Sequence, residues 1–198
     1  MRPHWALGLS GLYTATRLRF SGGVHAEQVR FATLASGAYL PTPRLVLQLG
    51  AGAAFGGSLV LPDGKYEFSP GPTALFGADY RAFDDGRYFL LLTSGLSFVS
   101  ARTHRGAEPS AGYQAFDLRL GGELGLEVAR VLRPYALARV FGGPVFWRYQ
   151  GAAVTGTDTH HFQLGAGVAA RASKALNLFV EGVPLGERAI SMGVALAL

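Results

Sequence analysis

Hydrophobic and polar residues alternate with a period of two along most of this chain, which is the pattern of β-strands with two unlike faces. The clearest stretch runs from Phe116 to Val128. Its even positions carry large apolar side chains and one glycine, whereas its odd positions carry aspartate, arginine, glutamate and glycine. The stretch is longer than an average strand of about five or six residues in a soluble protein, and long enough to cross a bilayer when tilted.

The same alternation recurs between turn signals and predicts ten antiparallel strands. They lie at about 4–18, 27–40, 44–57, 70–82, 87–101, 113–130, 134–149, 160–172, 175–183 and 188–198. Tight turns around 41–43, 84–86, 132–134 and 173–175 alternate with longer polar links around 19–26, 58–69, 102–112 and 150–159. This alternation of short turns and longer links, with an even strand number, is typical of up-and-down transmembrane barrels. We therefore predict an all-β, antiparallel transmembrane β-barrel of about ten strands, with eight as the alternative, in which residues 1–198 form a single domain.

The strand at 134–149 has two interpretations. Arg139 shares one face with Tyr135, Leu137 and Phe141, so an inward Arg139 leaves small residues on the lipid face. An outward arginine at the bilayer midplane would cost about 2–4 kcal/mol. The alternative is a bulge at the Gly-Gly-Pro sequence of 142–144, which would switch the phase of the strand. We favour the bulge.

The composition agrees with a protein that exposes little charge. The chain is 49% hydrophobic and 16% charged, with 28 glycines and no cysteine, whereas soluble domains carry about 25% charged residues. It has no run of about 18 apolar residues, so the spanning structure that remains is a closed barrel. The net charge of +5 comes from scattered basic residues, and we expect no nucleic-acid partner.

Aromatic residues gather near both ends of the predicted strands, as in the two girdles of transmembrane barrels. On the short-turn side they are Trp5, Tyr39, Tyr80, Phe83, Tyr88 and Tyr135. On the long-link side they are Tyr13, Phe68, Phe98, Tyr113, Phe116, Phe146, Trp147, Tyr149 and Phe162.

On its alternating strands and its terminal segment from Ile190 to Leu198, the chain resembles the small bacterial outer-membrane β-barrels, including OmpA-like and OmpW-like proteins. The resemblance covers nearly the whole chain and implies a place in the outer membrane, with both termini in the periplasm. It also implies insertion by the barrel-assembly machinery, to which such proteins present a last strand that usually ends in an aromatic residue, whereas this one ends in Leu198. Outer-membrane proteins are secreted, yet no signal peptide precedes the pattern that begins at Trp5. We expect a mature form, an excised domain or a form with a replaced start.

The inward face carries charges of both signs and many glycines. The predicted lumen residues are Asp79, Arg81, Asp117, Arg119, Glu123, Glu127, Arg171 and Glu181, with Arg30 and Arg139 as further candidates. Buried charges must be paired or hydrated. They predict either a salt-bridge network that holds a narrow barrel shut or a polar pathway for a small solute, and both interpretations stay open.

Basic residues recur near the long-link rim, at Arg17, Arg19, Lys65, Arg102, Arg105 and Arg148. They could bind the phosphates of outer-membrane lipid or lipopolysaccharide through charge-assisted hydrogen bonds, or they could simply solvate the links. Other envelope proteins are a further class of partner that the pattern allows.

Asp158, His160 and His161 lie at the start of the eighth predicted strand, on the long-link side. They resemble the omptin type of ten-stranded outer-membrane protease, which uses Asp and His on its outer rim, and a carboxylate can orient a histidine as a general base. No second outer aspartate pair accompanies them, because Asp84 and Asp85 fall on the short-turn side. We predict no metal site, because further spaced ligands are lacking, and no cofactor.

Three functions are compatible with these patterns. We prefer a non-enzymatic integral outer-membrane barrel, which acts as a structural or assembly component or as a narrow pore for small solutes. One alternative is an outer-membrane hydrolase, of the protease or lipid A deacylase type, with a site on the extracellular rim. The other is a soluble lipocalin-like ligand-binding barrel, which needs an apolar interior and a polar exterior. The side on which Asp117, Arg119, Glu123 and Glu127 lie separates this last alternative from the others.

Overall fold

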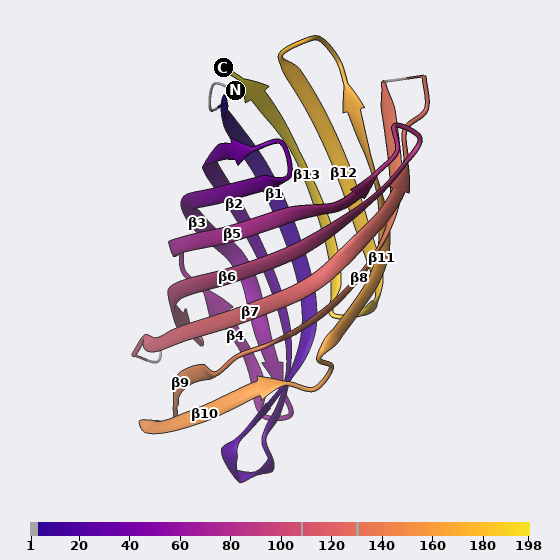
Figure 1. Ribbon diagram of the computed structural model, residues 1–198. Helices are drawn as coiled ribbons and strands as arrows, with labels where there is room; N and C mark the ends of the chain where they lie inside the picture. The colour runs from indigo at the N-terminus through magenta and orange to yellow at the C-terminus, as the bar shows by residue number, and fades with distance from the viewer. Residues whose placement is uncertain (1–3, 108, 130) are drawn as a thin grey trace.

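The computed structural model describes residues 4–107, 109–129 and 131–198, which form one antiparallel sheet closed into a barrel (Figure 1). The strands are β1 (His4–Phe20), β2 (His25–Thr42), β3 (Leu45–Leu61), β4 (Gly64–Phe68), β5 (Gly71–Asp84), β6 (Tyr88–His104), β7 (Ala111–Leu126), β8 (Leu132–Gly142), β9 (Val145–Tyr149), β10 (Ala152–Asp158), β11 (Phe162–Arg171), β12 (Leu176–Gly186) and β13 (Arg188–Ala197). Within the described residues, no helix is long and apolar enough to cross a membrane.

The two ends of the barrel differ in their connections. Both termini lie at one end, together with the connections β2–β3, β5–β6, β7–β8 and β11–β12, and we call it the turn end. The connections β1–β2, β3–β4, β6–β7 and β9–β10 lie at the opposite end, which we call the loop end. This arrangement matches the predicted alternation of turns and links.

The number of strands in the wall changes along the barrel. At the turn end ten strands close the ring, in the order β1-β2-β3-β5-β6-β7-β8-β11-β12-β13. At the loop end the ring passes through eight, in the order β1-β2-β3-β4-β6-β7-β9-β10. We call these parts the wide half and the narrow half. The predicted ring of about ten strands is confirmed, and a ring of eight occurs in the narrow half.

The change occurs because the β12–β13 hairpin stops part-way along the wall. Its last pair with β1 joins Arg188 to Ala15, and beyond it β10 pairs directly with β1 from Leu18 to Phe20. Gly186 at the hairpin tip has a φ of +84°, and a Cβ there would lie 1.7 Å from a backbone oxygen of the neighbouring strand. Only glycine fits this tight tip.

Strands β8 and β9 form one continuous strand without a change of phase. Along β7, Leu118 pairs with Gly142 and Ala115 pairs with Val145, so no residue is inserted between the two pairs. The bulge that we favoured near 142–144 is therefore wrong. The Gly-Pro interruption weakens the ladder, since proline has no N–H to donate, but the side chains keep their sides and Arg139 points inward.

Most residues of the predicted links belong to strands, which corrects their assignment as polar links. A bulge at Gly56 and Gly57 explains part of the error. Gly57 has a φ of +95°, and a Cβ there would lie 2.1 Å from the carbonyl oxygen of Val29. Beyond the bulge the strand changes phase, so that Leu59 and Leu61 are buried inside the barrel. Apolar residues therefore face inward in the narrow half, which reverses the pattern used for the prediction.

In the wide half the apolar side chains face outward. Leu118, Leu120 and Leu124 are 50–61% exposed, whereas the acidic and basic residues between them face the lumen. The soluble lipocalin-like alternative required the reverse. The outward aromatic rings lie at both edges of this apolar band, as the pairs Trp5–Tyr39 near the turn end (4.6 Å), and Tyr13–Phe31 (5.2 Å), Phe98–Phe116 (4.8 Å) and Phe116–Phe146 (6.4 Å) near the narrow half.

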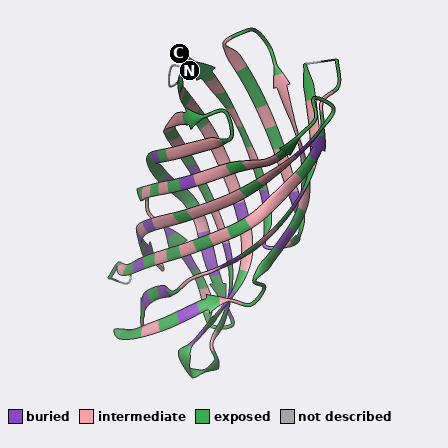
Figure 2. Ribbon diagram, viewed as in Figure 1, coloured by how far each residue is buried: buried purple, intermediate pink, exposed green. Residues whose placement is uncertain are grey.

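In the narrow half the polarity is inverted. The buried core is made of inward apolar residues: Leu18, Phe20, Ala26, Ala32, Ala54, Leu59, Leu61, Tyr66, Phe68, Val99, Ala101, Tyr113, Val145 and Trp147. Most buried residues therefore lie away from the two termini (Figure 2). Phe68, Tyr113 and Trp147, which we predicted in the outer girdle, belong to this core. The outward positions are polar instead, and include Arg19, Glu27, Lys65, Arg102 and Arg148.

Candidate functional site

The lumen of the wide half contains a salt-bridge cluster centred on Arg139. Arg139 on β8 donates to Glu181 on β12 through Nη1 at 2.7 Å and Nη2 at 2.9 Å, and to Glu123 on β7 through Nη2 at 2.8 Å. The hydroxyl of Tyr135 donates to Glu181 at 3.2 Å. The three charged side chains are only 11–17% exposed. A single arginine thus ties together three strands of the wall across the lumen.

A second cluster lies closer to the narrow half. Arg119 on β7 donates through Nε to Asp117. It also donates through Nη2 to Oε2 of Glu187, at 2.9 Å. Glu187 also accepts from Nε2 of Gln163 at 2.7 Å. Glu187 stands at the tip of the β12–β13 hairpin, so this cluster anchors the end of that hairpin inside the lumen. Asp117 Oδ1, Gln163 Oε1 and Arg30 Nη1 are buried without a partner in the described residues, and we expect water to bind them.

The other predicted lumen residues lie outside these two clusters. Near the turn end, Arg81 pairs with Asp84 at 2.7 Å, and Glu127 lies 3.8 Å from Arg133. Arg171 is exposed at the same end. Asp79 faces the lumen on β5, where it is electrostatically coupled to Glu123 and Arg139. The charged residues of the lumen therefore lie in layers that are stacked along the barrel axis.

On the loop-end side of the charged layers, the aromatic core fills the lumen of the narrow half. Tyr113 is 1% exposed and Trp147 3%. The Trp147 ring packs against Phe20 at 5.4 Å and Tyr66 at 5.1 Å, and Tyr113 packs against Phe68 at 4.9 Å.

The polar atoms of this core have partners inside it. Tyr113 donates its hydroxyl to Gln28 at 2.8 Å, and Trp147 donates its indole N–H to Thr103 at 2.9 Å. A core with such packing and with its polar atoms paired resembles the interior of a soluble protein more than a channel.

At the loop end, Asp63 joins three hairpins. It follows β3, and its carboxylate accepts from the hydroxyl of Tyr149 at 2.8 Å and from Arg105 at 3.3 Å. Arg105 also donates to the Asp63 carbonyl at 3.0 Å and lies over the ring of Tyr66. These contacts hold the β3–β4, β6–β7 and β9–β10 hairpins together over the aromatic core.

Asp158, His160 and His161 lie where β10 gives way to β11, but their side chains contact different partners. Asp158 accepts from the hydroxyl of Thr16 at 2.5 Å. Nδ1 of His160 lies 3.1 Å from the hydroxyl of Thr159. Among the described residues no hydrogen bond joins Asp158 to either histidine, and no group of three His, Asp or Glu residues could hold a metal ion.

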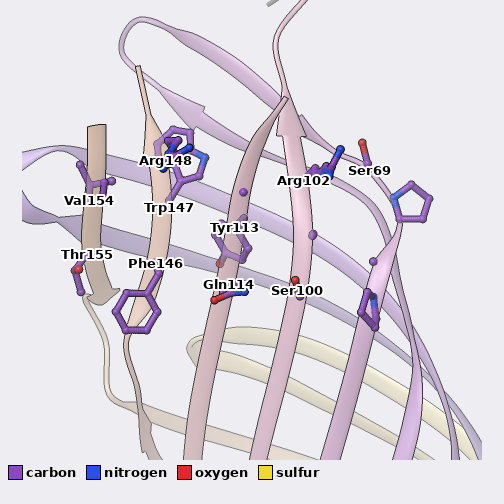
Figure 3. Close-up of a pocket in the computed structure, with 16 residues that line it drawn as sticks. Ser69, Ser100, Arg102, Tyr113, Gln114, Phe146, Trp147, Arg148, Val154 and Thr155 are labelled. Carbon is purple, nitrogen blue, oxygen red and sulfur yellow. The ribbon is translucent and has the colours of Figure 1, made fainter. Parts of the chain in front are cut away.

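The basic residues of the rim divide into paired and unpaired ones. Arg17 pairs with Glu27 at 3.1 Å, Lys65 with Glu67 at 3.2 Å and Arg105 with Asp63 at 3.3 Å. Arg19, Arg102 and Arg148 are exposed and have no ion-pair partner in the described part of the chain. Arg102 and Arg148 line one groove on the outer wall of the narrow half (Figure 3).

Comparison with known proteins identifies the fold. No protein-family model and no curated protein matches this sequence. Among solved structures, the outer membrane protease OmpT from Escherichia coli matches with a TM-score of 0.56 and 10% identity, over 98% of this chain and 94% of that one. The β domain of the Bordetella autotransporter BrkA matches with a TM-score of 0.52 and 14% identity, over 96% and 98%. The translocator domain of the autotransporter NalP from Neisseria meningitidis matches with a TM-score of 0.50 and 13% identity, over 98% and 88%.

The chain has the fold of a bacterial outer-membrane β-barrel. At these identities the likeness concerns the fold alone. Proteins with this fold include a protease and autotransporter domains, so the likeness does not select a function.

Sequence reasoning missed several residues of this outer-membrane-type barrel. Glu187 falls between the predicted strands at 175–183 and 188–198 and was given no role there, although it is the acid that anchors the β12–β13 hairpin in the lumen. Gln163 and Arg133 were not predicted as lumen charges or partners. The available signal for Glu187 was its position in a very short link, directly before an apolar strand. Its partner Arg119 lies far away in sequence, and no local pattern connects the two.

Proposed function

We propose that this chain is an integral outer-membrane β-barrel that spans the bilayer with its wide half and conducts no solute. The proposal is supported by the outward apolar band of the wide half and by the aromatic rings at its two edges. In this orientation the loop end faces the cell exterior and both termini face the periplasm. The barrel then acts as a closed structural module of the envelope, rather than as a pore or an enzyme.

The observation that carries the closed-barrel proposal is the aromatic core of the narrow half. A pathway through the lumen would have to pass Tyr113 and Trp147, which contact neighbouring rings on several strands. The charged clusters on the turn-end side of the core have their charges paired across the lumen, as in a barrel held shut. A hydrolase is less well supported, because Asp158 does not orient either neighbouring histidine.

Single-cysteine labelling tests the orientation, since the chain has no native cysteine. Ala152→Cys lies at the loop end and Ala172→Cys at the turn end, and both alanines are exposed. In intact bacteria that secrete the protein, a membrane-impermeant maleimide should label the variant at 152 and not the variant at 172. Labelling at both positions, or recovery of the protein in the soluble fraction, would contradict the membrane proposal.

Conductance in planar bilayers tests closure. We expect no current steps from the wild-type protein, with insertion verified by the heat-dependent migration that folded barrels show in gels. A variant with Phe20→Ala, Tyr113→Ala and Trp147→Ala removes the largest rings of the core and should produce steps under the same conditions. Discrete steps from the wild-type protein would show that the lumen is a passage.

A further inference from the structure

The cross-strand register places two arginines on either side of a glycine on the outer wall of the narrow half. Gly112 on β7 pairs with Arg102 on β6. On its other side, the pair of Tyr113 with Trp147 places Arg148 of β9 next to Gly112. Neighbouring strands are about 4.8 Å apart, so the two arginine backbones lie about 10 Å apart. Their long side chains can converge on one group held between them.

The surface between the two arginines is hollow. It forms a groove of about 610 Å³, and a Cβ added at Gly112 would meet no atom within 4 Å. One row closer to the wide half, Gln114 is a further polar side chain on the wall of the groove, and Phe146 begins the apolar surface (Figure 3). Phe116, next to Phe146, continues that surface into the apolar band.

The charge in this groove is unbalanced. Neither the guanidinium of Arg102 nor that of Arg148 has a hydrogen-bond or ion-pair partner within the described residues, whereas Arg17 on the same outer surface pairs with Glu27. Two unpaired arginines whose backbones flank one glycine are suited to an anion that accepts several hydrogen bonds. Arginine is better suited to this than lysine, because its planar fork can donate two bonds to one phosphate.

We propose that this groove binds the phosphate of a phosphorylated lipid of the outer leaflet. The lipid's phosphate lies between Arg102 and Arg148 over Gly112, and its acyl chains run along Phe146 and Phe116 toward the middle of the membrane. The apolar surface next to the two arginines favours a lipid over free phosphate, because free phosphate has no apolar part that could contact it. The assignment rests on the proposed membrane orientation, in which the narrow half stands at the level of the lipid headgroups.

Binding of lipid A to the folded protein in neutral detergent tests the assignment. The double variant Arg102→Gln/Arg148→Gln removes both guanidinium groups. Its matched control, Arg17→Gln/Arg19→Gln, removes the same charge from the outward face of β1. Each arginine–phosphate pair contributes roughly tenfold to affinity. We therefore expect the groove variant to bind lipid A at least about tenfold more weakly, and the control to bind within about twofold of wild type. Equal weakening of lipid A binding in both variants would mean that net charge alone causes the effect, and would refute the proposed site.

Two further arms identify the ligand. Gly112→Trp fills the groove without removing a charge, and it should weaken lipid A binding as strongly as the double variant does. Lipid A without its phosphates should bind the wild-type protein weakly, and inorganic phosphate should compete poorly. Full competition by inorganic phosphate would show a free-anion site, and undiminished binding of the dephosphorylated lipid would show simple acyl-chain packing.

These measurements use micelles and a folded protein, so they do not depend on insertion. A protein that binds lipid A through the two arginines but fails the cysteine-labelling experiment would refute the proposed orientation and keep the lipid site. A protein that spans the membrane as proposed, but binds lipid A equally well with and without the two arginines, would refute the lipid site alone.

Discussion

The wide and narrow halves of this barrel share the strands β1, β2, β3, β6 and β7 but place their apolar residues on opposite sides. On β7, Leu120 and Leu124 face outward in the wide half, whereas Tyr113 on the same strand faces inward in the narrow half. The wide half is stabilised by paired charges in a polar lumen, and its exterior requires an apolar surrounding. The narrow half has an aromatic core and a polar exterior, like a soluble β-barrel. The side on which the apolar residues lie is therefore a property of each half of the barrel and not of the individual strand.

The boundary between the halves coincides with three structural features. The β12–β13 hairpin ends there, the outward aromatic rings gather there, and Arg119 binds Glu187 there. Loss of two strands narrows the ring, and a narrower ring can be filled by side chains without a channel. The inversion of polarity and the change in strand number therefore support each other.

The largest expected effect comes from breaking the charged lumen of the wide half. Arg139→Ala leaves Glu123 and Glu181 buried without their partner, and should lower the free energy of unfolding by about 3–5 kcal/mol. Denaturant titration of the protein in lipid vesicles measures this loss. A variant with Arg139→Met, Glu123→Gln and Glu181→Gln removes all three charges together and should recover most of the stability. An equally large loss in this neutral variant would mean that packing, and not charge pairing, matters at Arg139.

The next effect tests the exteriors of the two halves with one arginine substitution in each. Leu120→Arg puts a charge in the apolar band, and should cost about 2–4 kcal/mol of stability in a bilayer. Val60→Arg makes a comparable change at an outward site of similar exposure in the narrow half. There it should change the free energy of unfolding by no more than about 0.5 kcal/mol. Equal costs at the two sites would show that both exteriors meet the same solvent.

A smaller effect is expected from the core of the narrow half. Trp147→Phe keeps an aromatic ring but removes the hydrogen bond to Thr103, whose side chain is fully buried. We expect a loss of about 1–2 kcal/mol in denaturant titration. The chain has one other tryptophan, Trp5, which lies on the exterior near the turn end. Trp5→Phe should cost less than Trp147→Phe, and the opposite order would contradict a structural core in the narrow half.

The smallest effect concerns a turn outside both halves. Asp85 accepts the backbone N–H groups of Tyr88 at 2.7 Å and Arg87 at 2.8 Å, and these bonds hold the pKa of its carboxyl below the ordinary value. A lowered pKa in the folded state stabilises the fold above the unfolded pKa of about 3.9, and the stabilisation disappears as the pH falls through the folded pKa. Asp85→Asn should therefore differ slightly from wild type at neutral pH and converge with it in acid. A difference in unfolding midpoint that is independent of pH would exclude this charge effect.

Much of the wide half could be predicted from single strands. The alternation from Phe116 to Leu126 assigns each residue to a side because successive side chains point to opposite faces of a strand. In the structure Asp117, Arg119 and Glu123 form ion pairs inside the lumen. The assignment failed beyond Gly57, where a bulge shifts the alternation by one residue, and at Tyr113. In both places the interior of the barrel is apolar, so the apolar side chains point inward instead of outward.

Local sequence thus determined the strand periodicity, the approximate number of strands and the polar lumen of the wide half, because these depend on neighbouring residues and on the solvent at each face. It could not show that Arg139 binds both Glu123 and Glu181, or that Glu187 enters the lumen, since these partners come from strands far apart in the chain. The tertiary structure alone decided that β10 replaces the last hairpin beside β1. That replacement depends on where the hairpin ends relative to its neighbours, which is a property of the closed ring and of no single segment.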